Sequence, residues 1–232
     1  MENFVIKPIG YIQTDFDEKF GIPRQSGRAP SLVARVIFNP EYRSMDALRP
    51  IEGFSHLWLL FDFSLAHKGE FTPLVRPPRL GGNKKVGVFA SRSPFRPNNI
   101  GLSSVKLIKV EQTEQFGATL LVSGADLLNG TPIYDVKPYL PFTDCHPDAI
   151  GGYADEQKDY KLTVELCQEV FDLLPQDKVI ALKECLEEDP RPSYQDDGKE
   201  YGLTFSGINI KFTVNNGTLT VLSAEKRPSH NA

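Results

Sequence analysis

The segment 89–102 carries the residues best suited to chemistry. Its sequence, FASRSPFRPNNIGL, places Arg92, Arg96 and two asparagines among two prolines. Guanidinium groups bind carboxylates and phosphates through paired hydrogen bonds, and prolines fix the backbone that presents them. A surface loop normally mixes charges of both signs, whereas this segment has no acid. We therefore predict an anion-binding site here, with a charged surface loop as the alternative.

Two shorter segments also combine polar residues with unusual backbone requirements. In the first, Arg24 and Gln25 offer directional donors, although a solvated turn is the alternative. In the second, His56 stands in an apolar run, where a hydrogen-bonded core histidine is the alternative, and Trp58 is expected in the core. These segments are residues 21–27 (GIPRQSG) and 54–58 (FSHLW).

A fourth segment, residues 124–139, combines a turn with a polar strand. Asn129-Gly130 is a hairpin-turn signal, which alone could explain it. Asp135, Lys137 and Tyr139 are two residues apart, so on a strand they share one face. An acid, a cation and a phenol together are costly in a core, and the pattern therefore indicates a site.

Several common sites have no sequence counterpart. The chain lacks the glycine patterns of dinucleotide-binding and phosphate-binding loops and the G-x-S-x-G pattern of a serine nucleophile. The four histidines lack zinc-ligand spacing, so no metal is expected. No signal peptide or membrane-length apolar run is visible, and three widely spaced cysteines favour a reducing, cytoplasmic environment.

Charge is distributed unevenly along the 232 residues. The net charge is −4, yet residues 71–110 contain eight Lys and Arg residues and no Asp or Glu. Removing these eight cations leaves −12 on the rest of the chain. One basic block is therefore expected to meet an anion while the remainder keeps the protein in solution.

The elements that would position these residues are mainly strands up to residue 150. Short β-branched and aromatic runs separated by Gly or Pro turns are typical of a closed or nearly closed β-barrel or a sandwich. The run 55–63 is nearly continuously apolar, which predicts burial on both faces. The expected strands are residues 4–12, 32–38, 55–63, 86–90, 103–110, 118–123 and 131–136.

The sequence pattern changes beyond residue 150, where helical spacing appears beside strand-like runs. Residues 168–174 and 178–186 have helical spacing, and Pro190 and Pro192 end the second helix. Strands are expected at 161–166, 201–214 and 218–222, the last after an Asn216-Gly217 turn. We therefore predict two domains, 1–150 (barrel) and 151–232 (small α+β), with the boundary between 145 and 160.

A series of motifs resembles one enzyme family, the bacterial tRNA N6-threonylcarbamoyladenosine methyltransferases. The resemblance covers nearly the whole chain and is tightest over residues 20–142. The motifs are PRQSG (23–27), FSHLW (54–58), RPPRLGG (76–82), GVFASRSPFRPN (87–98), IGLS (100–103), DVKPYLPF (135–142) and DPRP (189–192).

The resemblance implies a β-barrel catalytic domain and a homodimer with the cofactor near its interface. It implies methyl transfer from S-adenosylmethionine to N6 of N6-threonylcarbamoyladenosine, at position 37 beside the anticodon of a threonine tRNA. The resemblance also assigns Lys137, Tyr139 and Arg191 to the substrate, on a weaker match. The implied cofactor residues are Pro23, Arg24, Gln25, His56, Leu57, Arg92, Leu102, Leu128, Asn129, Gly130 and Thr131.

Methylation of this nitrogen needs a path for its proton. Its lone pair is delocalised into the purine and the ureido carbonyl, so a general base is expected. Asp135 or Tyr139 could serve, with Lys137 beside them, and the sequence does not choose. The threonyl carboxylate suits a bidentate arginine, Arg92 or Arg96.

Two other functions would also use the basic block. A non-catalytic RNA-binding barrel would bind tRNA without affinity for S-adenosylmethionine. An enzyme acting on a small anionic metabolite would use the arginine loops for phosphate or carboxylate, and tRNA would not protect those loops.

Overall fold

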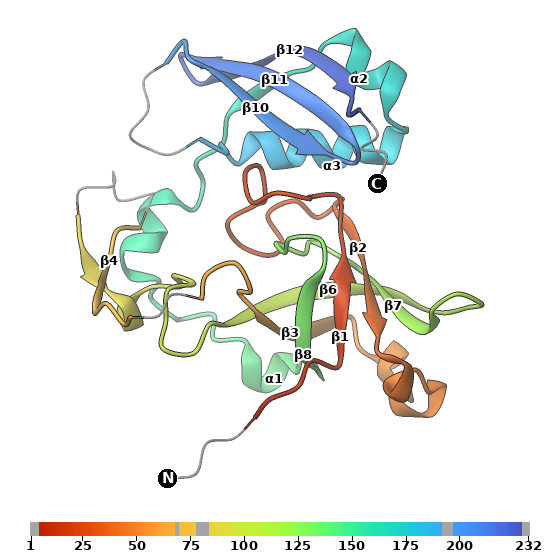
Figure 1. Cartoon of the computed structure of the whole chain (residues 1–232). Helices are drawn as coiled ribbons and strands as arrows, with labels where there is room; N and C mark the ends of the chain where they lie inside the picture. Colours follow the sequence, from red (N-terminus) through yellow and green to blue (C-terminus); the bar gives the residue numbers. More distant parts are fainter. Residues whose placement is uncertain (1–4, 68–69, 78–83, 192–196, 229–232) are drawn as a thin grey trace.

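The computed structural model of the chain describes residues 5–67, 70–77, 84–191 and 197–228. The predicted fold class is confirmed, because six strands within the first 140 residues form a closed barrel with strand order β1-β2-β7-β6-β3-β8 (Figure 1). Neighbouring strands in the barrel are antiparallel. The strands are β1 (Gly10–Gln13), β2 (Val33–Phe38), β3 (His56–Asp62), β6 (Ile100–Thr113), β7 (Gly117–Ser123) and β8 (Thr131–Pro138).

Alternation along each strand fills the barrel. On β3, Leu57, Leu59 and Phe61 are buried while Trp58 and Leu60 lie on the outer face. The prediction that this strand is buried on both faces was therefore wrong: a strand in a barrel wall meets the core with one face only. Other inward residues with no exposed surface are Ile12, Val36, Leu120, Val122 and Ile133.

The register brings three connections to one end of the barrel. Ile12 pairs with Thr131, Val33 with Ser123, and Asp62 with Ile100. The β1–β2, β3–β6 and β7–β8 connections therefore leave the barrel at the same end, which we call the loop end. The segments 21–27, 89–99 and 124–130, predicted to carry chemistry, all belong to these connections.

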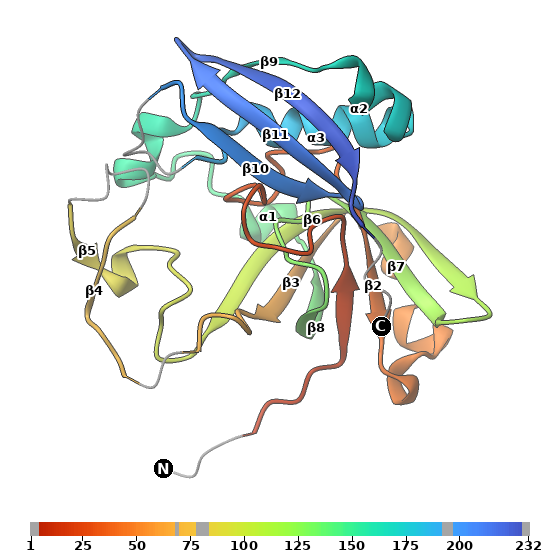
Figure 2. The same ribbon diagram turned by 45° about the horizontal axis from the view of Figure 1, so that its top comes forward.

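Two strands expected before residue 150 differ from the structure, and the strand expected over residues 201–214 is in fact two antiparallel strands with a turn between Phe205 and Ile208. The first is shorter, since β1 begins at Gly10 and Phe4 lies outside the described residues. The run 86–90 is not a barrel strand: β5 (Val86–Gly87) pairs with β4 (Leu74–Val75), and a 3-10 turn, η5 (Val88–Ala90), follows. This small hairpin projects from one side of the barrel (Figures 1 and 2).

Short helical turns link the barrel strands and lead to the C-terminal part. Ser44 caps the start of η2, because its side chain accepts a hydrogen bond from the Asp46 amide. The turns are η1 (Pro40–Tyr42), η2 (Met45–Leu48), η3 (Ile51–Gly53), α1 (Pro141–Asp144) and η6 (Gly152–Gln157).

The C-terminal unit is a four-stranded sheet with helices on one face (Figure 2). Strand order is β10-β11-β12-β9, with β9 parallel to β12. Asn216 and Gly217 both have positive φ, as a tight β11–β12 hairpin requires. The elements are β9 (Thr163–Glu165), α2 (Gln168–Leu173), α3 (Gln176–Glu187), β10 (Glu200–Phe205), β11 (Ile208–Asn215) and β12 (Thr218–Lys226).

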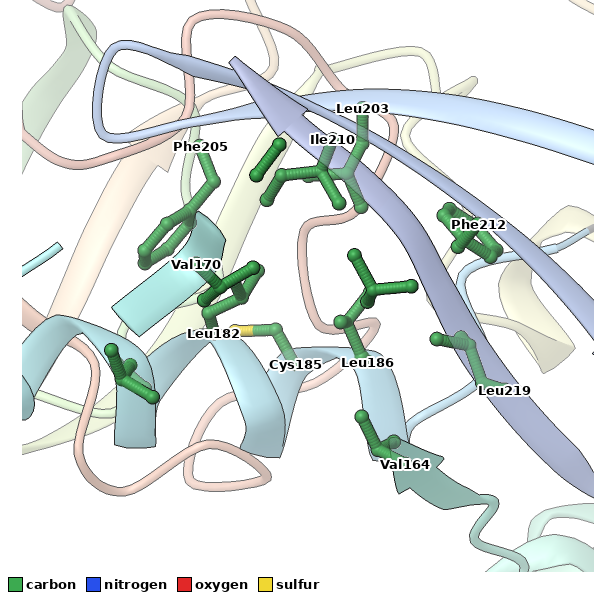
Figure 3. Close-up of a cluster of buried hydrophobic side chains, with 14 of the residues drawn as sticks. Val164, Val170, Leu182, Cys185, Leu186, Leu203, Phe205, Ile210, Phe212 and Leu219 are labelled. Atoms are coloured by element: carbon green, nitrogen blue, oxygen red, sulfur yellow. The ribbon is translucent and has the colours of Figure 1, made fainter. Parts of the chain in front are cut away.

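The core of this unit lies between helix and sheet. Val170, Leu182 and Leu186 of the helices face Phe205 and Phe212 of the strands (Figure 3). Each of these five side chains is fully buried. The 3.6-residue spacing that predicted α3 therefore marks its sheet-facing side.

The β1–β2 connection completes this same core. Phe16, Ala29 and Leu32 belong to the C-terminal cluster rather than to the barrel core. The Phe16 ring packs edge-on against Phe205, with ring centroids 5.2 Å apart. The connection that carries Arg24 is therefore packed between the two units.

Candidate functional site

Two of the predicted segments meet at the loop end through Arg92. Its Nη1 donates to the Gln25 side-chain oxygen at 2.6 Å, and Gln25 Nε2 donates to the Arg24 carbonyl at 2.6 Å. Arg92 and Gln25 are exposed, whereas the Pro23 side chain before them is buried. The structure thus presents an arginine and an amide together on two loops that the sequence separates widely.

Arg96 stabilises the proline-rich loop instead of facing solvent. Its Nη1 donates to the Val88 carbonyl at 3.1 Å and to the Ser91 carbonyl at 2.7 Å. Asn99 Nδ2 donates to the Pro94 carbonyl at 2.7 Å. Of the two arginines considered for a substrate carboxylate, Arg92 is therefore the more accessible one.

A carboxyl group that sequence reasoning passed over lies beside Arg92. Asp126 is half-buried just after β7, and Ser103 Oγ donates to its Oδ1 at 2.5 Å. Burial raises the pKa of Asp126, while Ser103, the Arg92 charge and the Ser26 amide act in the opposite direction. The one signal in the sequence is an acid directly after an apolar strand.

The turn 128–131 packs along the start of the β1–β2 connection. The Asn129 amide donates to the Phe16 carbonyl at 2.8 Å, and its side chain donates to Asp17 at 3.1 Å. Gly130 has φ +77° with open space where a Cβ would stand. Thr131 Oγ1 donates to the Leu128 carbonyl. This turn and Arg24 are therefore held by the same connection.

Arg191 contributes its backbone carbonyl to the loop-end residues, where it contacts Arg24. Its carbonyl accepts from Arg24 Nη2 at 2.6 Å, so the C-terminal unit holds the Arg24 side chain. The Arg191 guanidinium itself pairs with Asp189 at 2.9 Å and Asp197 at 3.1 Å, and these carboxylates raise its pKa. A positioning role fits this geometry better than direct binding of a substrate anion.

His56, Lys137 and Tyr139 lie at the opposite end of the barrel, whereas Asp135 and Leu102 lie between the two ends, each beside Leu60. Tyr139 lies against His56 and Trp58, with ring centroids 6.2 Å and 5.4 Å away. Lys137 and Asp135 form an ion pair at 2.8 Å, which raises the pKa of Lys137. Thr131 and Lys137 are six strand residues apart, about 20 Å at the usual rise. Within one chain, the predicted site is therefore divided into two groups.

Several side chains in this second group lie differently from expectation. His56 is exposed, so it is not a core histidine, and Trp58 is half-buried on the outer face, where its Nε1 donates to Asp144 at 2.8 Å. Leu57 is 0% exposed inside the barrel, so neither its side chain nor its main chain reaches the surface of a single chain. Leu102 is exposed on the outer face of β6, opposite Leu60 of β3.

The carboxyl end of β3 leads into the loop end of the barrel. Lys19 Nζ donates to the Leu65 carbonyl at 3.3 Å, and Asn99 Nδ2 donates to the Ala66 carbonyl at 3.2 Å. His67 Nε2 lies 2.8 Å from an Asp62 oxygen. The turn after β3 thus lies beside the loop-end residues, although it was not singled out from the sequence.

The described residues offer neither a metal-ligand cluster nor a membrane-spanning helix. No group of three or more His, Cys, Asp or Glu side chains in this part of the chain is placed to hold a metal ion. No helix among the same residues is both long and apolar enough to cross a membrane.

Comparison with known proteins gives consistent matches. Residues 11–145 match the family model of the tRNA-methyltransferase O N-terminal domain, and residues 159–227 match that of the TrmO C-terminal domain. The chain is 39% identical over 236 residues to the Escherichia coli K12 protein named tRNA (adenine(37)-N6)-methyltransferase, covering 98% of this chain and 100% of that protein.

Two further relatives come from Pseudomonas aeruginosa. A protein of strain PAO1 named putative S-adenosylmethionine-dependent methyltransferase RcsF is 40% identical over 214 residues, covering 88% of this chain and 90% of that one. The crystal structure of TrmO superposes with a TM-score of 0.78 at 32% identity, covering 97% of this chain and 100% of that chain.

The buried carboxyl gives a prediction about stability. We expect Asp126→Asn to have a higher free energy of unfolding than wild type, by a margin that grows as the pH rises above about 4, the ordinary pKa of an aspartate carboxyl. A raised folded-state pKa makes ionisation of Asp126 destabilising, and asparagine removes that ionisation while keeping the acceptor for Ser103. Urea unfolding at pH 4 and at pH 7 measures the difference. An advantage that shrinks toward pH 7 would contradict a raised pKa.

Proposed function

This chain belongs to the tRNA-methyltransferase O family, and on that premise we propose that it methylates N6 of threonylcarbamoyladenosine at position 37 of tRNA. It is an S-adenosylmethionine-dependent tRNA methyltransferase that acts on N6 of adenine 37. The observation that carries this conclusion is full-length similarity to a protein of that name. The threonylcarbamoyl group and the threonine tRNA are the proposed finer details, with the anticodon loop as the part recognised.

The residues of the loop end fit S-adenosylmethionine chemically. The molecule has a carboxylate, a cationic amine and sulfonium, and an adenine edge. The Arg92 guanidinium suits the carboxylate, the Asp126 carboxyl suits a cation, and the Gln25 amide suits an adenine edge. When bound, the cofactor supplies an electrophilic methyl group. The proposed cofactor set is Pro23, Arg24, Gln25, His56, Leu57, Arg92, Leu102 and Leu128, Asn129, Gly130 and Thr131.

The chain's contribution to the reaction is positioning and removal of a proton. Holding two reactants in line can lower a barrier by roughly 7–11 kcal/mol. The proposed catalytic residues remain Asp135, Lys137 and Tyr139, with Arg96 and Arg191 near the substrate. Within one chain, burial and the acidic groups around it raise the pKa of Tyr139, which favours its protonated form. We therefore propose Tyr139 as a hydrogen-bond donor and Asp135 as the base.

A homodimer would bring the two groups together. We propose that the outer face of β3, β6 and β8 forms its interface, so that His56 and Tyr139 of one copy approach Arg92 of the other. In support, this face exposes the apolar side chains of Ile100, Leu102 and Ile108. Large apolar side chains gathered on an outer face are typical of a subunit interface.

We also propose a division of labour along the chain. Residues 1–150 would hold the cofactor and carry out transfer, and residues 151–232 would support the loop end and the tRNA. A tRNA substrate further favours action in the cytoplasm.

The function is tested by supplying the substrate in two forms. We expect the chain to transfer labelled methyl from S-adenosylmethionine to threonine tRNA that carries threonylcarbamoyladenosine, and not to the same tRNA lacking that group. Scintillation counting of the recovered tRNA measures transfer. Equal labelling of both tRNAs would remove the threonylcarbamoyl requirement. Binding of tRNA with no cofactor affinity or transfer would instead favour an RNA-binding barrel.

Arg92 gives the sharpest variant. We expect Arg92→Ala to keep the fold and lose at least about 100-fold in turnover, since an accessible charged hydrogen-bond donor is removed from the site. Steady-state kinetics measure the loss, and circular dichroism checks the fold. The matched control is Arg49→Ala, directly after η2, where the guanidinium pairs with Asp46 at 3.1 Å; this variant should keep normal turnover. Near-normal kinetics for Arg92→Ala would remove this residue from the site.

The dimer is tested by placing a charge on its proposed face. We expect Ile108→Glu, at an exposed position on β6, to shift the protein toward monomer, because burying an unpaired carboxylate in an interface is costly. Sedimentation velocity measures the mass. Leu222→Glu, at an exposed position on β12 of the C-terminal sheet, is the control. A native monomer, or an Ile108→Glu protein of unchanged mass, would refute this interface.

A further inference from the structure

The hairpin that projects from the barrel exposes two stacked phenyl rings. Phe71 and Phe89 are 55% and 72% exposed, with ring centroids 6.4 Å apart and planes inclined by 25°. We call these two residues, with the described parts of the hairpin, residues 70–77 and 84–90, the aromatic arm. Two rings of this size on a projecting hairpin contribute nothing to either core.

The backbone around Phe89 is firmly held. Val88, just before it, is buried, and its amide donates to the Pro73 carbonyl at 2.9 Å. Ser91 Oγ donates to the Val88 carbonyl at 2.8 Å, and Tyr153 Oη donates to the Ala90 carbonyl at 3.1 Å. The ring is therefore presented in one place by a fixed turn, so binding on it costs little ordering entropy.

The surroundings of the rings are cationic. The Arg96 guanidinium lies 5.6 Å from the Phe89 ring centroid, and Arg76, Lys84 and Lys85 on the arm are exposed. Apart from the exposed Glu70, the arm belongs to the acid-free block 71–110, of which Arg79 lies outside the described residues. Exposed aromatic rings interleaved with cations match single-stranded nucleic acid, in which flat bases alternate with phosphates.

The arm also adjoins the proposed transfer site. Phe89 precedes Arg92 by three residues, so their Cα atoms are at most about 11 Å apart, at the length of an extended chain. Stacked nucleotides rise about 3.4 Å each along one strand. A base on Phe89 would therefore be only a few nucleotides from the base being methylated.

We propose that the aromatic arm is a stacking platform for unpaired anticodon-loop bases next to the target adenosine. This proposal rests on the proposed function and adds to it the surface that binds the anticodon loop. Two rings among cations offer too little apolar area for a stable protein interface, which needs about 1,000 Å². Bases splayed from a loop, however, are recognised by stacking of this kind.

The test compares RNA and cofactor binding in one variant. We expect Phe89→Ala to raise the Kd for an anticodon stem-loop RNA by about 5- to 150-fold, the range given by loss of one stacked base. The Kd for S-adenosylmethionine should stay within error. Fluorescence polarisation with labelled RNA and calorimetry with the cofactor measure the two constants. Phe89→Trp should restore RNA binding, because it restores a flat ring.

The controls separate this proposal from others. Tyr42→Ala removes an exposed aromatic ring on η1, outside the arm and the proposed dimer face, and should leave RNA binding unchanged. Phe71→Ala is a second variant of the arm and should weaken RNA binding as well. Unchanged RNA affinity in both arm variants, failure of Phe89→Trp to restore it, or equal loss of cofactor affinity would overturn the platform. Because wild-type methyl transfer is measured separately, the enzyme's function would survive that result.

Discussion

The position of the site depends on apolar contacts made by one connection with a unit remote in sequence. The β1–β2 connection inserts Phe16, Ala29 and Leu32 into the C-terminal core, and between these anchors it carries Arg24 and Gln25. Long connections without regular structure are seldom ordered unless something holds them. Here, burial of three apolar side chains supplies the stabilisation, at roughly 1.5–3 kcal/mol for a large one.

Polar contacts then fix the orientation of the same connection. Glu188 on the C-terminal side pairs with Arg28 at 2.8 Å, and Glu184 accepts from both the amide and the hydroxyl of Ser31. Such contacts are more directional than apolar packing, so they determine how the connection lies rather than how strongly it is held. The Arg24 side chain, bound to the Arg191 carbonyl, is the last link from the C-terminal unit to the cluster.

Sequence reasoning worked where the physics is local and failed where it is not. The apolar run of β7 and the spacing of Val179, Leu182 and Leu186 on α3 depend on neighbours in sequence, so these two elements were predicted closely, whereas β12 extends four residues beyond its expected end. Residues 86–90 were expected to form one strand, yet only Val86 and Gly87 do so. The Val88 carbonyl instead accepts hydrogen bonds from the side chains of Arg96 and Ser91.

The site shows the same limit. That Arg92 and Gln25 share a surface could be inferred only through the resemblance, since no local rule joins residues so far apart. Asp126 was passed over because its importance comes from Ser103 and Arg92, which approach it only in the folded barrel. His56 and Thr131 were grouped by motif, and the strand register separates them.

The shared connection also constrains the order in which the protein can mature on the ribosome. β1 and β2 emerge early, and the barrel could close once β8 has been made. Phe16 and Leu32, however, have no finished core to enter until β12, the last strand of the chain, has left the exit tunnel. The connection that carries Arg24 therefore packs only after β12 has been made, and a nascent chain that stops before β12 would hold this connection less firmly even with a complete barrel.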